Sequence, residues 1–229
     1  MVDYLKTTKK SVLIGGILFL LLILFTVAAS FQLLEHTNFS KQIKFSISRL
    51  AIWGCLFLLY IYSIKMERQP FLLWTEEKYS LIFFLKSVAK LMFSLFLIML
   101  VVYFIFKIAD SNIDSKKMNE IMKLFKNNIF LILFTSITAG VTEELIFRGY
   151  LIPRLEILLK NTPAAILISS ILFGLIHYSY GTLIQIIGPV FIGLLFAVYY
   201  QKYKNIKILI MCHFLWDLLV LLNKTSQLQ

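Results

Sequence analysis

Seven long apolar segments constrain the fold of this 229-residue chain more than any other feature of its sequence. They comprise residues 11–33, 45–64, 88–108, 130–152, 163–178, 183–200 and 206–222. A membrane-spanning helix needs roughly 20 apolar residues, with a range near 17–25, and only the fifth and seventh segments are short by that measure. The chain is therefore predicted to be an all-α, polytopic transmembrane bundle.

The composition excludes a soluble domain. Hydrophobic residues make up 59% of the chain and charged residues only 15%, whereas a soluble domain carries about 25% charge. The net charge of +11 does not indicate nucleic acid binding, because most lysines stand between apolar segments, where they contact lipid headgroups. We expect one membrane domain over residues 1–229, with N-terminal spans and interfacial segments in 1–127 and the core helices that carry the polar motifs in 128–222.

Two connecting segments have features of the membrane surface. Met118, Ile121, Met122 and Phe125 follow helical spacing, while neighbouring lysines occupy other faces, which predicts an amphipathic interfacial helix. The segment 69–84 mixes aromatic and charged residues and is interpreted as a surface or re-entrant piece. Whether this segment holds an eighth span stays open.

The distribution of lysines predicts an orientation. Lys202, Lys204 and Lys207 form the clearest basic cluster, and the connection at 178–182 is uncharged; by the positive-inside rule the N-terminus is then cytoplasmic. The first apolar segment is longer than the 7–15 apolar residues of a signal peptide, so we expect it to be retained. Abundant Ile, Lys, Phe and Leu are compatible with an AT-rich bacterial gene, which points to a bacterial plasma membrane.

Six ionisable side chains lie inside three of the later apolar segments. They are Glu143, Glu144, Arg148, His177, His213 and Asp217. On insertion scales a central Asp or Arg costs about 2.5–3.5 kcal/mol, so such residues persist only where they are paired, hydrated or functional. Each one alone is also typical of a structural ion pair or an interhelical hydrogen bond, but together they indicate a shared functional site.

The spacing of the acidic pair separates a structural carboxylate from a free one. Glu144 and Arg148 lie four residues apart, on one helical face, while Glu143 is rotated by about 100° from Glu144. We therefore interpret Glu144 as the ion-paired carboxylate. A carboxylate without a cationic partner in a low-dielectric cavity is suited to act as a general base, which makes Glu143 the candidate base.

The same spacing recurs in two other segments. His213 and Asp217 are four residues apart, so the carboxylate can hold the imidazole in one tautomer. Phe173 and His177 repeat this interval, which allows the phenyl ring to form a wall of the site.

Small residues precede the ionisable groups at four-residue intervals. Ser136 and Gly140 precede the two glutamates, and Ser170 and Gly174 precede the first histidine. In membranes this pattern lets helix backbones approach closely, so we expect these helices to pack tightly.

Together the three motifs resemble those of the CPBP intramembrane proteases, the CAAX proteases and bacteriocin-processing enzymes also called the Abi family. The family pattern is E-E-x-x-x-R, then F-x-x-x-H, then H-x-x-x-N or H-x-x-x-D. This chain has Glu143-Glu144-Leu145-Ile146-Phe147-Arg148, then Phe173-Gly174-Leu175-Ile176-His177, then His213-Phe214-Leu215-Trp216-Asp217. The resemblance covers about one third of the chain and implies peptide-bond hydrolysis within the membrane.

The resemblance also implies a role for each residue. Glu143 and His177 would activate the attacking water, while His213 and Asp217 would stabilise the tetrahedral oxyanion. Asp217 departs from the asparagine of some members, because an ionised carboxylate cannot donate a hydrogen bond. It must then be protonated or act indirectly by orienting His213.

A metal is the alternative to a mechanism without cofactors. The family is often labelled as metalloproteases. Glu143, His177 and His213 are three ligands that suit a catalytic zinc, and Asp217 would then support these ligands without binding the metal. The sequence lacks the H-E-x-x-H signature, and we favour the reading without a metal. The two cysteines lie in apolar segments and are interpreted as packing residues.

The expected partners are the lipid bilayer and a membrane-anchored or amphipathic peptide substrate. Two other classes of function remain open. Buried Glu, Arg and His also build the relays of ion-coupled transporters, and a non-catalytic immunity or scaffold protein can share a protease-like fold. The sequence does not indicate an oligomeric state.

Overall fold

The computed structural model describes residues 9–111, 113 and 115–227, and these residues form helices and connections with no strand among them. In chain order the helices are α1 (Lys10–Glu35), α2 (Lys41–Tyr62), η2 (Ser63–Glu67), α3 (Leu81–Ile108), α4 (Lys116–Phe125), α5 (Ile129–Thr138), η3 (Ala139–Leu151), α6 (Ile152–Leu159), α7 (Thr162–Leu175), η4 (Tyr178–Tyr180), α8 (Ile184–Tyr203) and α9 (Ile206–Ser226). Seven helical stretches among them are long and apolar enough to cross a membrane. The predicted all-α polytopic fold is confirmed.

The connection between the second and third spans holds no eighth span. Residues 68–80 are non-helical, and α3 begins at Leu81, earlier than the predicted residue 88. Polar contacts fix this segment against the ends of α8 and α9, because Glu76 accepts hydrogen bonds from the Tyr200 hydroxyl at 2.7 Å and from the backbone N–H of Ile206 at 2.8 Å. These contacts hold a charged segment at the end of the bundle, where it need not enter the apolar core.

Among the described residues, side-chain caps determine where six of the nine α-helices begin. In each case a Ser or Asn side chain accepts a hydrogen bond from the backbone N–H three residues further on; the capping residues are Ser40, Ser80, Ser115, Asn128, Asn161 and Asn205. The first N–H groups of a helix have no partner within it. The caps therefore fix each starting residue, and with it the depth of the residues that follow.

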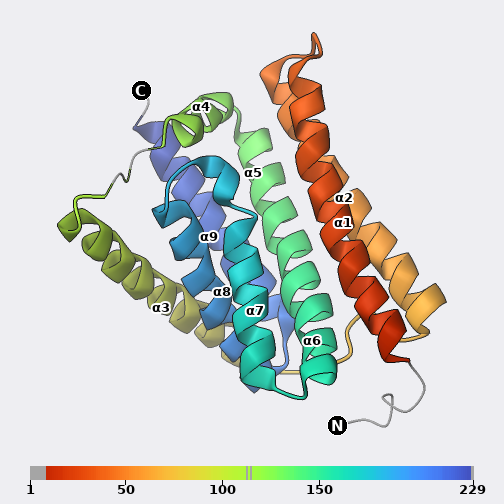
Figure 1. Ribbon diagram of the computed structural model, residues 1–229. Helices are drawn as coiled ribbons and strands as arrows, with labels where there is room; N and C mark the ends of the chain where they lie inside the picture. Colours follow the sequence, from red (N-terminus) through yellow and green to blue (C-terminus); the bar gives the residue numbers. More distant parts are fainter. Residues whose placement is uncertain (1–8, 112, 114, 228–229) are drawn as a thin grey trace.

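Small residues allow the central helices to approach closely, as predicted. A Cβ atom built on Gly140 would lie 2.9 Å from the backbone nitrogen of Phe214, and one on Gly174 would lie 2.7 Å from the carbonyl oxygen of Ile186. Gly140 thus brings η3 against α9, and Gly174 brings α7 against α8. Figure 1 shows these helices together in the centre, with the α1–α2 hairpin on one side and α3 on the other.

The predicted amphipathic helix is α4. Its residues Met122 and Phe125 are buried against Phe45, Leu131 and Ile132, and its lysines are exposed. In Figure 1 this helix lies across the end of the bundle at which α5 begins and α9 ends.

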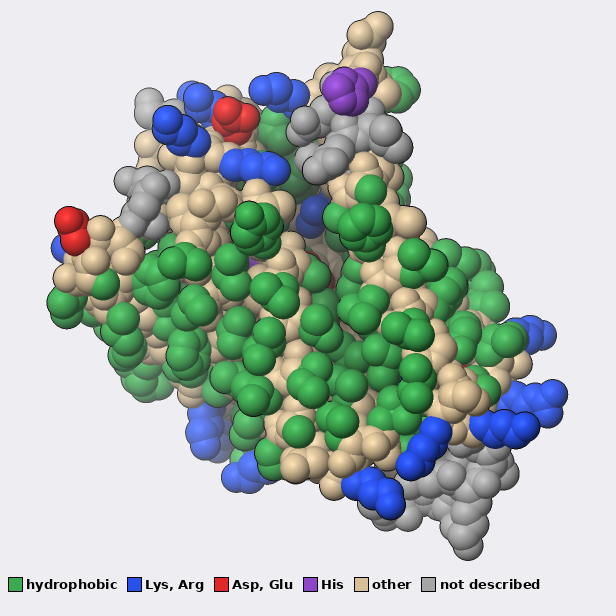
Figure 2. Space-filling view, viewed as in Figure 1, with side chains coloured by type: hydrophobic (Ala, Val, Ile, Leu, Met, Phe, Trp, Pro, Cys, Tyr) green, Lys and Arg blue, Asp and Glu red, His purple; other side chains and the backbone are tan. Residues whose placement is uncertain are grey.

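The outer surface matches a lipid environment. Figure 2 shows hydrophobic side chains over the middle of the visible face, with Lys and Arg side chains gathered toward its two ends. Large exposed apolar residues in the middle of a span, such as Phe93 and Phe96 on α3, are therefore suited to face hydrocarbon, and the basic residues lie where headgroups are expected.

Candidate active site

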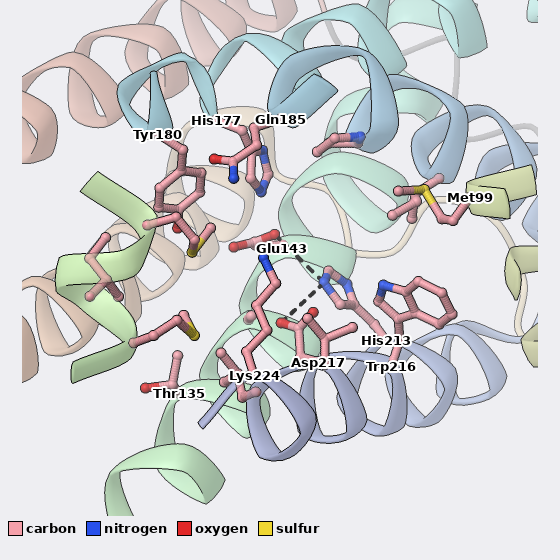
Figure 3. A pocket seen from close by; sticks show the side chains of 18 of the residues that line it. Met99, Thr135, Glu143, His177, Tyr180, Gln185, His213, Trp216, Asp217 and Lys224 are labelled. Carbon is pink, nitrogen blue, oxygen red and sulfur yellow. Dashed lines mark ion pairs between the residues drawn. The ribbon is translucent and has the colours of Figure 1, made fainter. Parts of the chain in front are cut away.

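Three helical segments bring the predicted site residues around one cavity. Glu143 lies on η3, His177 lies in the turn two residues past the end of α7, and His213 and Asp217 lie on α9. All four line a cavity of about 510 Å³. Figure 3 shows Glu143 between His177 on one side and His213 with Asp217 on the other.

The acidic pair lies in a π-helix, which the sequence periodicity did not predict. This helix, η3, is 13 residues long, whereas π-helices are mostly single turns with i→i+5 hydrogen bonds and occur frequently at functional sites. Its wider turn changes the angle between consecutive side chains, and both Glu143 and Glu144 are buried.

Glu144 forms the ion pair that its spacing predicts, and it also contacts a third helix. Arg148 Nη1 lies 2.9 Å from Glu144 Oε1, and both side chains are buried. The same oxygen lies 2.7 Å from Nδ1 of His213. Because a carboxylate only accepts hydrogen bonds, Nδ1 of His213 carries a hydrogen in this arrangement. Its Nε2 lies 3.9 Å from Glu143 Oε2 and 3.7 Å from Asp217 Oδ2.

These distances correct the expected role of Asp217 in holding the imidazole. At 3.7 Å from Nε2, Asp217 is beyond hydrogen-bond length, while Glu144 makes the short contact. The tautomer of His213 is therefore set by Glu144, from another helix. A local i,i+4 pair was the only partner that the sequence could suggest.

Glu143 and His177 present unshared acceptor atoms to the cavity. Glu143 Oε2 is buried and has no hydrogen-bond partner among the described residues. His177 Nδ1 lies 2.7 Å from the carbonyl oxygen of Phe173, which can only accept. Nδ1 is thus the donor, and in the neutral ring Nε2 keeps its lone pair. Buried polar groups are almost always satisfied by protein or ordered water, so Glu143 Oε2 is an acceptor left for water or a ligand.

Phe173 forms the wall that its spacing suggested. Its buried ring lies 5.0 Å from the His177 ring and 6.1 Å from the His213 ring, measured between centroids. The Arg148 guanidinium lies over the same ring at 4.3 Å from the centroid. One phenyl ring therefore packs against both histidines and the Arg148 guanidinium, and it forms a wall of the cavity.

Sequence reasoning missed several polar residues of the cavity. Arg49 from α2, Tyr180 from η4, Gln185 from α8 and Lys224 from α9 all line it. A signal for Arg49 was present, because it is a charge within the second apolar segment. Tyr180 gives no such signal, since a tyrosine near a span end is common.

The candidate zinc ligands do not form a preformed metal site. Within residues 9–111, 113 and 115–227, no group of three or more His, Cys, Asp or Glu side chains is arranged to hold a metal ion. Nδ1 of His213 is engaged with Glu144, and the two cysteines are buried and free.

Fold and site together define a multi-spanning membrane protein with a carboxylate–imidazole centre buried among its helices. Residues 125–219 match the family model described as Type II CAAX prenyl endopeptidase Rce1-like. This segment, from the end of α4 into α9, is a domain of that family, and the match implies a protease. Comparisons with curated proteins and with solved structures found no match.

Proposed function

We propose that the protein is an intramembrane endopeptidase in which Glu143 and His177 activate a water molecule. The observation that carries the proposal is the pair of unshared acceptors, Glu143 Oε2 and the second ring nitrogen of His177, lining the same cavity. A water held between a carboxylate and an imidazole can lose its proton as it attacks.

The proposed reaction has two steps. The water oxygen bonds to the scissile carbonyl carbon while its proton passes to Glu143, and the electron pair of the C=O bond moves onto the carbonyl oxygen. That pair then re-forms the double bond, the C–N bond breaks, and the proton held by Glu143 passes to the departing amine. The products are a carboxylic acid and an amine, with no net change at the protein.

His213 and Asp217 are proposed to stabilise the oxyanion between these steps. As an imidazolium, His213 donates from Nδ1 to Glu144 and from Nε2 toward the cavity. In a dry site such a donor stabilises the transition state by about 2.7–4 kcal/mol. Asp217, 3.7 Å from Nε2, supports the charged form of the ring through its negative charge.

The lining of the cavity supports an apolar or amphipathic peptide as substrate. Met99, Met118 and Met122 contribute flexible thioether side chains, which adapt to varied apolar groups. Membrane-anchored precursors, such as leader or signalling peptides, fit this lining. We further propose a bacterial plasma membrane location with a cytoplasmic N-terminus.

The test is cleavage of candidate peptide precursors by the purified protein in detergent. Glu143→Gln and His177→Ala are each expected to lower kcat by about 10²–10⁴-fold, the usual worth of a general base. Glu120→Gln, which neutralises an exposed carboxylate on α4, is the matched control and should cleave like wild type. Each assay is run with and without chelator.

Three results would count against the proposal. Cleavage that survives Glu143→Gln excludes this carboxylate as the base. Cleavage that a chelator abolishes and zinc restores supports the metal mechanism. A cellular immunity phenotype that persists in Glu143→Gln favours a non-catalytic role.

A further inference from the structure

Arg49 enters the cavity from outside the segment that matches the protease family. It is half-buried on α2 and lines the same cavity as Glu143 and Asp217. Its guanidinium lies 4.9 Å from the centroid of the Phe45 ring, and its Nε is 3.4 Å from the Ser48 hydroxyl oxygen. These contacts hold the side chain along α2 with its charged end at the cavity.

The charge of Arg49 is directed at the polar groups of the site. Arg49 lines the same cavity as Tyr180, His177 and Asp217 and acts electrostatically on all three. The other two buried guanidiniums are committed elsewhere, Arg148 to Glu144 and Arg154 to Glu67. Among the described residues, no carboxylate lies within 4.0 Å of Arg49, so its charge remains available to a ligand.

The charges of the site explain why such a cation is needed. Glu143 and Asp217 both face the cavity as acids, and hydrolysis moves the negative charge of Glu143 onto the carbonyl oxygen in the cavity that Asp217 also lines. An ionised Asp217 repels that charge and has no hydrogen to donate. A guanidinium, by contrast, is always charged and presents five N–H donors.

We propose that Arg49 stabilises the oxyanion of the tetrahedral intermediate and compensates for the aspartate at position 217. This role rests on the proposed hydrolysis. Tyr180, which lines the same cavity, acts as a positioning residue for the guanidinium. The first helical hairpin thereby contributes a catalytic residue to the matched domain.

The test compares catalysis with binding of a tetrahedral mimic. Arg49→Gln is expected to lower kcat by about 10²–10³-fold with little change in KM. It should weaken binding of a phosphinate peptide, whose anionic centre mimics the intermediate, by a similar factor. Binding of the matching uncleaved peptide to Glu143→Gln should be unaffected by the added Arg49→Gln. Lys41→Gln removes a charge from the exposed first turn of the same helix and should behave as wild type.

The Asp217→Asn background gives the sharpest readout. Asparagine can donate a hydrogen bond to the oxyanion, and it removes the negative charge of Asp217. In this background Arg49→Gln should therefore lower kcat by less than tenfold. This double variant also remains informative if Arg49→Gln alone fails to fold, because it leaves no uncompensated charge.

Two results overturn the inference alone. One is wild-type cleavage that Arg49→Gln leaves unchanged, and the other is equal loss of phosphinate and substrate binding, which would assign Arg49 to docking. If the wild-type chain shows no Glu143-dependent cleavage, the proposed function and the inference both fail.

Discussion

A single methyl group at Gly140 is expected to disturb both the fold and the chemistry. In Gly140→Ala the new Cβ would lie 2.9 Å from the backbone nitrogen of Phe214 and 3.0 Å from the carbonyl oxygen of Ile210. Ordinary van der Waals contact begins at 3.4 Å, and backbone atoms cannot rotate away as a flexible side chain can. Helix α9 must therefore move from η3 by about 0.5 Å, the shortfall between 2.9 and 3.4 Å.

The expected magnitudes follow from that displacement. Overpacking of this kind costs about 1–3 kcal/mol, and the better helix propensity of alanine offsets up to about 1 kcal/mol. We expect a net loss of about 1–2 kcal/mol in the free energy of unfolding. His213 directly precedes Phe214, so the shift also moves the imidazole away from Glu143. A misplacement of a catalytic group by 1 Å can lower kcat by about 10²-fold. For half of that distance we expect kcat to fall by about tenfold.

The assay is reversible unfolding in detergent micelles, paired with the peptide-cleavage rate. Gly54→Ala on α2 is the matched control, because a Cβ at Gly54 has no neighbour within 4 Å. It should be neutral or slightly stabilising, with unchanged cleavage. If Gly140→Ala unfolds and cleaves like Gly54→Ala, the claim that backbone contact between η3 and α9 positions the site is refuted.

Two further predictions concern buried charge. Arg148→Met leaves Glu144 buried without its cation and should destabilise the protein by about 3–5 kcal/mol; unfolding in micelles should show that adding Glu144→Gln recovers much of this. Burial lowers the pKa of Lys204, at the end of α8, from its ordinary 10.5 to about 8. The folded state therefore binds this proton less tightly than the unfolded state, so wild-type stability should rise relative to Lys204→Met between about pH 8 and 10.5. If the difference in the free energy of unfolding between wild type and Lys204→Met stays constant over this pH range, the lowered pKa of Lys204 is contradicted.

Features with a local sequence signal were predicted well. The apolar runs predicted seven spans because each span must be apolar along its own length, whatever its neighbours. The ion pair of Glu144 with Arg148 was predicted because i,i+4 neighbours meet within one helix. The close approach at Gly140 and Gly174 was predicted from small residues, although the spacing did not say which helix each would meet.

Features that depend on distant segments were missed. His213 takes Glu144 from η3 as its partner in place of its local neighbour Asp217, and that choice is fixed by how α9 packs. The buried pair of Arg154 with Glu67, whose closest atoms are 2.6 Å apart, joins residues 87 positions apart. Both residues resembled ordinary charges at span ends. These contacts form only through tertiary packing, and the periodicity of the sequence does not indicate how distant segments pack.

The length of α7 explains how water chemistry can occur at this depth. Its 14 residues extend about 21 Å at 1.5 Å per residue, which is shorter than a hydrocarbon core of roughly 30 Å. A helix of this length that begins at one edge of the core leaves the residues after it, His177 among them, short of the opposite headgroups, and His177 lines the cavity there. Helix α4 covers that space with Met118 and Met122, and the Ser115 hydroxyl at its start donates to the carbonyl oxygen of Tyr180. The fifth apolar segment, predicted to be short, is thus the helix that ends at this cavity.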